Sequence, residues 1–172
     1  MKSLLAIIVI AGIGMKIGAT ETVLLEGWRF FRGDEDGAQA LDYDDSSWES
    51  VRIPHDWAIA GPFDRTNDLQ VTKTLWEGET IVRTHTGRTG GLPWVGKGWY
   101  RRSLDIPKGT EYAELVFDGA MSAPTVYADG KKVGEWKYGY SSLSCQFLQQ
   151  QEKLQCHWKI SLQALAGILV LD

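Results

Sequence analysis

Residues 124–136 read PTVYADGKKVGEW and hold two strand-like runs on either side of the pair Asp129-Gly130. An Asp-Gly pair tolerates the positive φ angles of a type I′ turn, which joins two antiparallel strands through two residues. Because the turn length sets which residues face each other, the stretch also fixes a pairing register. It therefore predicts a β-hairpin and indicates an antiparallel all-β fold.

Further strand-like runs lie on the N-terminal side of this hairpin. They are residues 23–31, 51–53, 99–106 and 114–118. Trp28 and Phe30 share one face of the first run. Pro54 and Pro107 end two of the others, because proline donates no hydrogen bond to a strand ladder. With no credible helical pattern between the runs, the sequence predicts an antiparallel β-sandwich.

Two polar stretches are predicted to lie at the surface. Residues 64–86 carry few apolar side chains and are expected to form a long surface loop, with Trp76 as a possible anchor. A second stretch carries six acids in segments of turn composition, which we interpret as solvated loop charge. These acids are Asp34, Glu35, Asp36, Asp42, Asp44 and Asp45.

Length and composition are those of one globular domain. The chain has 172 residues, of which 44% are hydrophobic and 23% charged, so disorder is not expected. It is too short for a catalytic barrel of roughly 250 residues together with a second domain. The formal net charge of −4 argues against nucleic acid as a partner, because phosphate binding favours a basic surface.

The first 19 residues resemble a secretory signal. Lys2 supplies a positive start, residues 4–15 are apolar, and Gly18 and Ala19 offer a small-residue cleavage site. The apolar run is too short for a stable membrane span, and Lys16 interrupts its end, which disfavours the alternative of an uncleaved anchor. We therefore expect an exported protein, periplasmic or extracellular.

Several motifs together resemble a known family. Residues 89–102 read TGGLPWVGKGWYRR, 115–122 LVFDGAMS, 126–136 VYADGKKVGEW and 138–142 YGYSS, and 53–57 read IPHDW. These stretches resemble the N-terminal sugar-binding domain of family 2 glycoside hydrolases, the β-galactosidase and β-glucuronidase group. The resemblance covers residues 20–142 and implies a jelly-roll β-sandwich of the galactose-binding type. The strand pattern alone does not select a jelly roll over another sandwich.

The resemblance also implies what this chain lacks. Glycoside hydrolysis needs two carboxyl groups that flank the scissile bond, and in this family both belong to a later barrel domain. No catalytic residue is therefore carried over, no cofactor is expected, and the chain alone is expected to be inactive. We interpret it as the sugar-binding domain of an exported β-galactosidase-like hydrolase, with carbohydrate as the ligand of the intact family. The alternatives are a free-standing carbohydrate-binding module and an interaction protein.

Three aromatic residues are candidates for carbohydrate contact. Sugars are bound by hydrogen bonds to their hydroxyl groups and by stacking of a ring face on an aromatic side chain. Trp94, Trp99 and Tyr100 lie among glycines that let a ligand approach the backbone. For Trp99 and Tyr100 packing in the core is favoured, whereas for Trp94 both interpretations stay open. No Asn occurs between residues 89 and 100, although some relatives place a substrate-contacting Asn there.

Two charged pairs have competing interpretations. One interpretation makes His55 and Asp56 an acid–base pair beside Trp57, but no nucleophile accompanies them. A structural turn that buries Trp57 is the favoured interpretation. Arg101 and Arg102 are adjacent in a strand and therefore point to opposite faces. We expect one to bond an acid within the sheet and the other to face solvent.

The tail, residues 143–172, departs from the family pattern and is rich in glutamine and leucine. One interpretation is an amphipathic helix, because apolar residues recur at helical spacing. These residues are Leu154, Trp158, Leu162, Leu165 and Leu169. The favoured interpretation is a change of reading frame near Leu143, which predicts an incomplete sandwich that aggregates. Cys145 and Cys156 allow a disulfide but match no zinc spacing, even with His157, so no metal site is expected.

Overall fold

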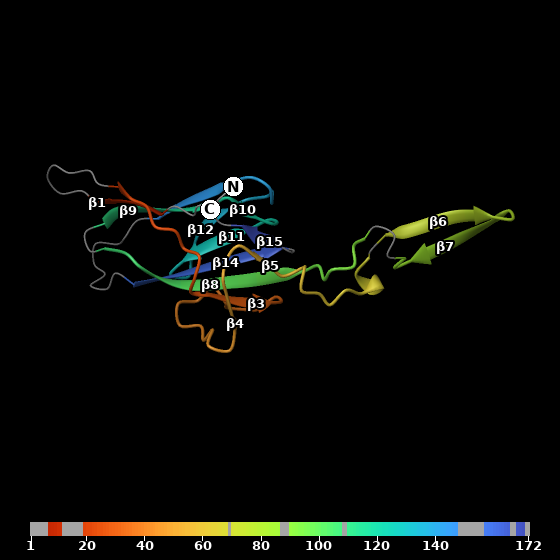
Figure 1. Cartoon of the computed structure of the whole chain (residues 1–172), viewed down its shortest axis with the longest axis horizontal. Helices are drawn as coiled ribbons and strands as arrows, with labels where there is room; N and C mark the ends of the chain where they lie inside the picture. Colours follow the sequence, from red (N-terminus) through yellow and green to blue (C-terminus); the bar gives the residue numbers. More distant parts are fainter. Residues whose placement is uncertain are drawn as a thin grey trace. The chain divides into compact units, whose positions relative to one another are not determined.

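The computed structural model describes residues 7–11, 19–68, 70–86, 90–107, 110–147, 157–165 and 168–170. Almost all of its regular structure is antiparallel β-strand (Figure 1). The strands are β1 (Ile7–Ala11), β2 (Ala19–Thr20), β3 (Trp28–Arg32), β4 (Glu49–Val51), β5 (His55–Asp56), β6 (Val71–Trp76), β7 (Glu79–Thr84), β8 (Lys97–Asp105), β9 (Thr110–Phe117), β10 (Gly119–Ala120), β11 (Thr125–Ala128), β12 (Lys131–Glu135), β13 (Leu143–Phe147), β14 (His157–Leu165) and β15 (Ile168–Val170).

Two compact units divide the chain. The sandwich unit comprises residues 1–55 and 96–172, and the insert unit comprises residues 56–95. In the sandwich unit, a six-stranded sheet has the order β12-β11-β14-β8-β3-β4 and a four-stranded sheet has the order β13-β9-β1-β2. A small third sheet has the order β10-β15-β5. The predicted antiparallel all-β architecture is confirmed.

The predicted hairpin at residues 124–136 is also confirmed. β11 and β12 pair antiparallel, and the two residues between them have φ of 48° at Asp129 and 78° at Gly130. These positive angles are the ones that a type I′ turn requires. Gly130 therefore has a conformational reason for being glycine.

The tail forms a strand at the centre of the larger sheet, not a helix. β14 pairs with β8 over nine positions, from His157↔Asp105 to Leu165↔Lys97, and with β11 on its other side. The helical interpretation is therefore wrong for residues 157–165, because their backbone pairs with β8 throughout and with β11 at residues 160–163. Leu162 is fully buried. Leu154 and Cys156 lie outside the described residues, and the change of reading frame stays a prediction.

The core of the sandwich lies between one face of each large sheet. In the six-stranded sheet, the buried side chains include Trp28, Phe30, Tyr100, Leu162 and Val126. In the four-stranded sheet, every second residue of β13 is buried, and Leu115 and Phe117 of β9 are inaccessible to solvent. A Cβ added at Gly134 of β12 would overlap Sγ of Cys145 in β13, so the two sheets meet there without spare volume.

The segment predicted as a signal contributes to this unit. Residues 7–11 form β1, which pairs with β9 from Ile7↔Leu115 onward. The rest of the predicted signal, up to residue 18, lies outside the described residues. Within the described part of the chain, we find no helix with the length and apolar character needed to span a membrane.

The insert unit contains a strand ribbon where a loop was expected. A single 3-10 turn, η1 (Arg65–Asn67), precedes β6 and β7, which pair with each other across six positions. Glu77 and Gly78 connect them with φ of 49° and 82°. Most side chains of the ribbon are exposed on both faces, so the apolar–polar alternation that marks a half-buried strand is missing. Trp76 is 64% exposed and does not anchor the segment.

Candidate functional site

Two of the three sugar-contact candidates are buried in the sandwich unit. Trp99 is 3% exposed and Tyr100 is 2% exposed, and as neighbours in β8 they occupy opposite faces of the sheet. Tyr100 packs against Phe30 with ring centroids 4.8 Å apart, and Trp99 packs against Tyr127 at 5.9 Å. Neither ring offers a free face to a sugar here. Both belong to the core, the interpretation that the sequence favoured.

Trp94 differs from these two because it is partly exposed. It lies in the insert unit and meets the edge of buried Trp57, with ring centroids 5.4 Å apart and an interplanar angle of 74°. The neighbouring backbone is held in place, since Leu92 O accepts hydrogen bonds from Asp64 N at 3.0 Å and Asn67 Nδ2 at 2.8 Å. The Trp94 side chain is thus held in place by its neighbours and still has solvent-accessible surface.

His55, Asp56 and Trp57 have separate structural roles. Nδ1 of His55 is hydrogen-bonded to the Tyr100 hydroxyl at 2.9 Å. Oδ1 of Asp56 accepts a hydrogen bond from Ala58 N at 2.9 Å, which closes a local turn. Trp57 is 4% exposed. These contacts are those of a structural turn that buries Trp57.

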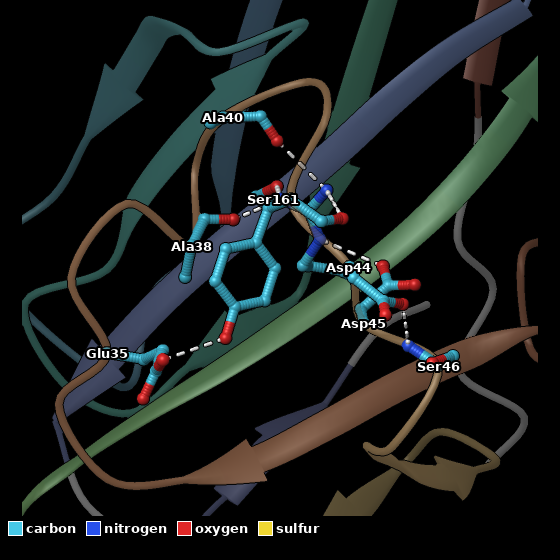
Figure 2. A network of polar contacts seen from close by, with 9 residues as sticks. Glu35, Ala38, Ala40, Asp44, Asp45, Ser46 and Ser161 are labelled. Carbon is cyan, nitrogen blue, oxygen red and sulfur yellow. Dashed lines mark hydrogen bonds and ion pairs between the residues drawn. The ribbon is translucent and has the colours of Figure 1, made fainter.

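Arg101 is the centre of a polar network in the sandwich unit, and its partners Ala38, Ala40, Asp45 and Ser161 are labelled in Figure 2. Its side chain is completely buried, and Nε donates to Oδ2 of Asp45 at 2.9 Å. Nη1 donates to Oγ of Ser161 in β14 at 3.0 Å and also to Ala38 O. Nη2 donates to Ala40 O at 3.0 Å. A buried guanidinium needs partners of this kind to offset its lost hydration.

The network fixes the loop of residues 33–48 to the outer face of the six-stranded sheet. Ala38 and Trp48 of this loop are buried against Trp99. Tyr43 packs beside Arg101, with the guanidinium carbon 5.3 Å from the ring centroid. The sequence predicted an acid partner for one of the two arginines, but it did not single out Asp45. The partner is 56 positions away, and no local pattern marks a contact over that separation.

Glu35 and Asp44 of this loop accept hydrogen bonds from other residues of the same loop. The Tyr43 hydroxyl donates to Oε1 of Glu35 at 2.8 Å; burial and then this carboxylate raise the pKa of Tyr43. Oδ1 of Asp44 accepts from Ser46 N at 2.9 Å, and this backbone hydrogen bond lowers the pKa of Asp44. The loop therefore uses its carboxylates to hold its fold.

Arg102 does not face open solvent as expected. Its guanidinium carbon is 5.9 Å from the ring centroid of the buried Trp28, so Arg102 lies on the core-side face of the sheet. Burial lowers its pKa. Nε and Nη1 are buried without a hydrogen-bond partner among the described residues. The side chain is therefore partly desolvated at the sandwich core.

A metal centre is not formed by the described side chains, because no three His, Cys, Asp or Glu residues among them gather closely enough. Cys145 is a buried free thiol. Burial raises its pKa to about 11, so it is neutral at physiological pH.

Curated relatives match the central part of the chain. It is similar to a β-galactosidase of Bacteroides ovatus, with 31% identity over 119 residues, which make up 68% of this chain and 12% of the relative. It is also similar to a β-glucuronidase of Formosa agariphila, with 25% identity over 115 residues, 66% of this chain and 10% of the relative. The chain thus spans about a tenth of the length of these relatives. No family model matches it.

Solved structures agree on the fold. A family 2 glycosyl hydrolase from Bacteroides cellulosilyticus has a TM-score of 0.62 and 22% identity, over 84% of this chain and 19% of that chain. A β-glucuronidase from Bacteroides uniformis has a TM-score of 0.58 at 22% identity, over 84% of this chain and 16% of that chain. The fold is thus that of a β-sandwich domain found within much larger carbohydrate-acting enzymes. With the curated relatives, this identifies the chain as a domain-sized part of a family 2 glycoside hydrolase.

Proposed function

We propose that the chain serves as the sugar-binding sandwich domain of an exported family 2 glycosidase and does not cleave glycosidic bonds by itself. The observation that carries this proposal is its match to a tenth of the length of a β-galactosidase and a β-glucuronidase. The loop acids support it: Asp45 bonds Arg101 and Asp44 bonds a turn, and a glycosidase needs two free carboxyl groups facing one bond.

The activity of the whole protein is hydrolysis of terminal β-glycosides. In that setting the sandwich braces the catalytic domain and shapes the substrate entrance, and Trp94 supplies a ring face for a sugar. The T-shaped contact with Trp57 supports this role. Because this contact already restricts the Trp94 side chain, the indole loses little side-chain entropy when a ligand stacks on it.

Turnover tests the proposal directly. The purified chain is incubated with chromogenic β-galactosides and β-glucuronides, and no aglycone release is expected. Release by material free of host enzyme, and retained after further purification, would refute the proposal. Trp94 is tested in the longer enzyme: Trp94→Ala should raise KM, whereas Trp76→Ala, which removes an exposed indole elsewhere in the insert unit, should leave KM unchanged.

Export has its own measurement. Cleavage after Ala19 predicts a mature N-terminus at Thr20 and a four-stranded sheet that loses β1, and cell fractionation should find the protein outside the cytoplasm. N-terminal sequencing of the secreted form checks both, and an intact Met1 in the exported fraction would exclude cleavage.

A free-standing carbohydrate-binding module is the second candidate. The central position of β14 favours it, because the larger sheet takes its middle strand from this chain itself. A module must bind a sugar alone. Measurable affinity of the isolated chain for galactosides would support the module, and absence of binding would support the domain of a larger enzyme.

A further inference from the structure

The insert unit contains a polar groove that the proposed function does not use. Its volume is about 560 Å³, and it is lined by two arginines, one histidine and four threonines. The two arginines are Arg65 of η1 and Arg83 of β7, and no carboxylate side chain is among the lining residues that the structure describes. The chain as a whole has a net charge of −4, so the positive charge of this groove is opposite in sign to that of the whole chain.

The register of β6 and β7 determines which side chains of the ribbon share the face with Arg83. Thr72 of β6 lies directly opposite Arg83 of β7, so their side chains share one face of the ribbon, and Thr74 follows two positions along on the same face. Lys73 lies between the two threonines in sequence and therefore on the other face. The ribbon thus separates its cations, with Arg83 toward the groove and Lys73 away from it.

Local hydrogen bonds fix the segment before β6 and the segment after β7, which line the rest of the groove. The Asp64 carboxylate accepts from Thr66 N at 2.7 Å and so begins η1, which carries Arg65. After β7, Nδ1 of His85 is hydrogen-bonded to Asp68 O at 2.9 Å. These contacts fix the backbone on both sides of the groove.

The charge of the two guanidinium groups is not compensated within the described residues. Neither Arg65 nor Arg83 takes part in an ion pair there. Asp64 is already engaged, since hydrogen bonds from Thr66 and, to a smaller extent, the nearby His85 lower its pKa. Asp68 is 3% exposed, and its carboxylate accepts from Gln70 N at 3.0 Å and from the hydroxyl of the groove-lining Thr86 at 3.5 Å. The groove therefore favours an anion.

We propose that this groove binds an anionic sugar residue, through the carboxylate of a uronic acid or a sulfate ester. A guanidinium presents paired N–H donors that match either group. The threonine hydroxyls both donate and accept, which suits the hydroxyl groups of a sugar ring. The groove volume lies in the range of small-ligand sites and exceeds what a bare inorganic anion fills. A neutral sugar would leave both arginines unpaired. This inference goes beyond the proposed function, which needs no charged ligand.

The test measures binding of defined oligosaccharides to the whole chain by isothermal titration calorimetry. Oligogalacturonate carries carboxylates, a heparin-derived oligosaccharide carries sulfate esters, and a β-galactan oligosaccharide is neutral. The variants are Arg65→Gln and Arg83→Gln, with Lys73→Gln as the matched control, because it removes the same charge from the opposite face of the same ribbon. Each arginine variant should weaken binding of the recognised anion about tenfold, and the control should change it less than twofold.

The outcomes separate this inference from the proposed function. Preference for oligogalacturonate identifies a uronate site, and preference for the heparin fragment identifies a sulfate-ester site; either supports the proposal. If neither anionic ligand binds, or if Lys73→Gln weakens binding as much as Arg83→Gln, the groove assignment is overturned. Binding of the neutral galactan bears on the carbohydrate-binding module alone, because no charged group takes part.

Discussion

The sandwich unit and the insert unit are both built from antiparallel strands, but different forces maintain them. Along β8 five of the nine residues are buried, including the charged Arg101. Along β6 and β7, only Thr72 and Ile81 are even partly buried. Burial of apolar area stabilises the first unit, whereas the ribbon depends on its backbone ladder and on loop hydrogen bonds. The sandwich should therefore be sensitive to substitution, and the insert should tolerate changes that alter its binding properties.

The largest expected effect concerns Arg101. Arg101→Met leaves Asp45 and several loop carbonyls without their donor, so we expect a loss of about 3–5 kcal/mol in the free energy of unfolding. Urea denaturation followed by tryptophan fluorescence measures it.

Arg52→Met is the matched control for this substitution. Arg52 pairs with Glu26 at 2.6 Å, but the two side chains are 61% and 71% exposed, so the loss should stay within about 1 kcal/mol. Equal losses of stability for the two variants would contradict this expectation. They would show that burial of the Arg101–Asp45 pair does not determine how much the pair contributes to the free energy of unfolding.

Alkaline pH should destabilise the sandwich through Cys145. The thiol has its pKa raised to about 11 in the folded protein, so the unfolded chain releases its proton at lower pH than the folded chain. Stability from this group is present below the unfolded pKa and falls as pH rises toward 11, by about 2–3 kcal/mol.

Unfolding in urea between pH 8 and pH 11 measures this slope. Cys145→Ala provides the comparison, because the tyrosines remain in both proteins while the thiol is removed. An identical pH dependence in the two proteins would contradict the buried neutral thiol.

A smaller loss is expected from Gly134→Ala. The new methyl group would overlap Sγ of Cys145, and relief of that overlap should cost about 1–3 kcal/mol. Thermal unfolding measures the loss. The double variant Gly134→Ala with Cys145→Ala tests the cause, since the added methyl group should cost less once the sulfur is gone.

The smallest effect is predicted for the ribbon. Leu75 is 72% exposed, so Leu75→Ala should change the free energy of unfolding by no more than about 0.5 kcal/mol. The same urea titration checks it. A loss comparable to that of Gly134→Ala would mean that the ribbon contributes to a core after all.

Sequence patterns predicted the elements whose signal is local. The Asp129-Gly130 turn and the strands that end before prolines were predicted because backbone chemistry marks them within a few residues. The ribbon of β6 and β7 was missed because both of its faces are exposed, which removes the alternation of apolar and polar side chains. β14 was missed because its leucines also fit a helical spacing, and only pairing with two distant strands decides between them.

The candidate site residues also divide into those that the sequence marks locally and those that only the fold brings together. The sequence proposed Trp94, Trp99 and Tyr100 together, since an aromatic residue beside glycines suits either a sugar or a core. Burial separates them, and burial depends on strands from elsewhere in the chain. Whether Trp94 contacts a sugar stays a prediction. The groove residues Arg65 and Arg83 were not proposed at all, because they are 18 positions apart in a mostly polar stretch and only the ribbon brings them together.

The place of β14 in the larger sheet has a consequence for how the protein is made. β8, with β3 and β4 beside it, and the hairpin β11–β12 all leave the ribosome earlier than β14, the strand that joins them. Until residues 157–165 emerge, each part keeps an open strand edge, and such edges invite pairing with other nascent chains. Closure of the sheet thus waits for β14, and the yield of folded protein should depend on chaperones that shield these edges in the interval.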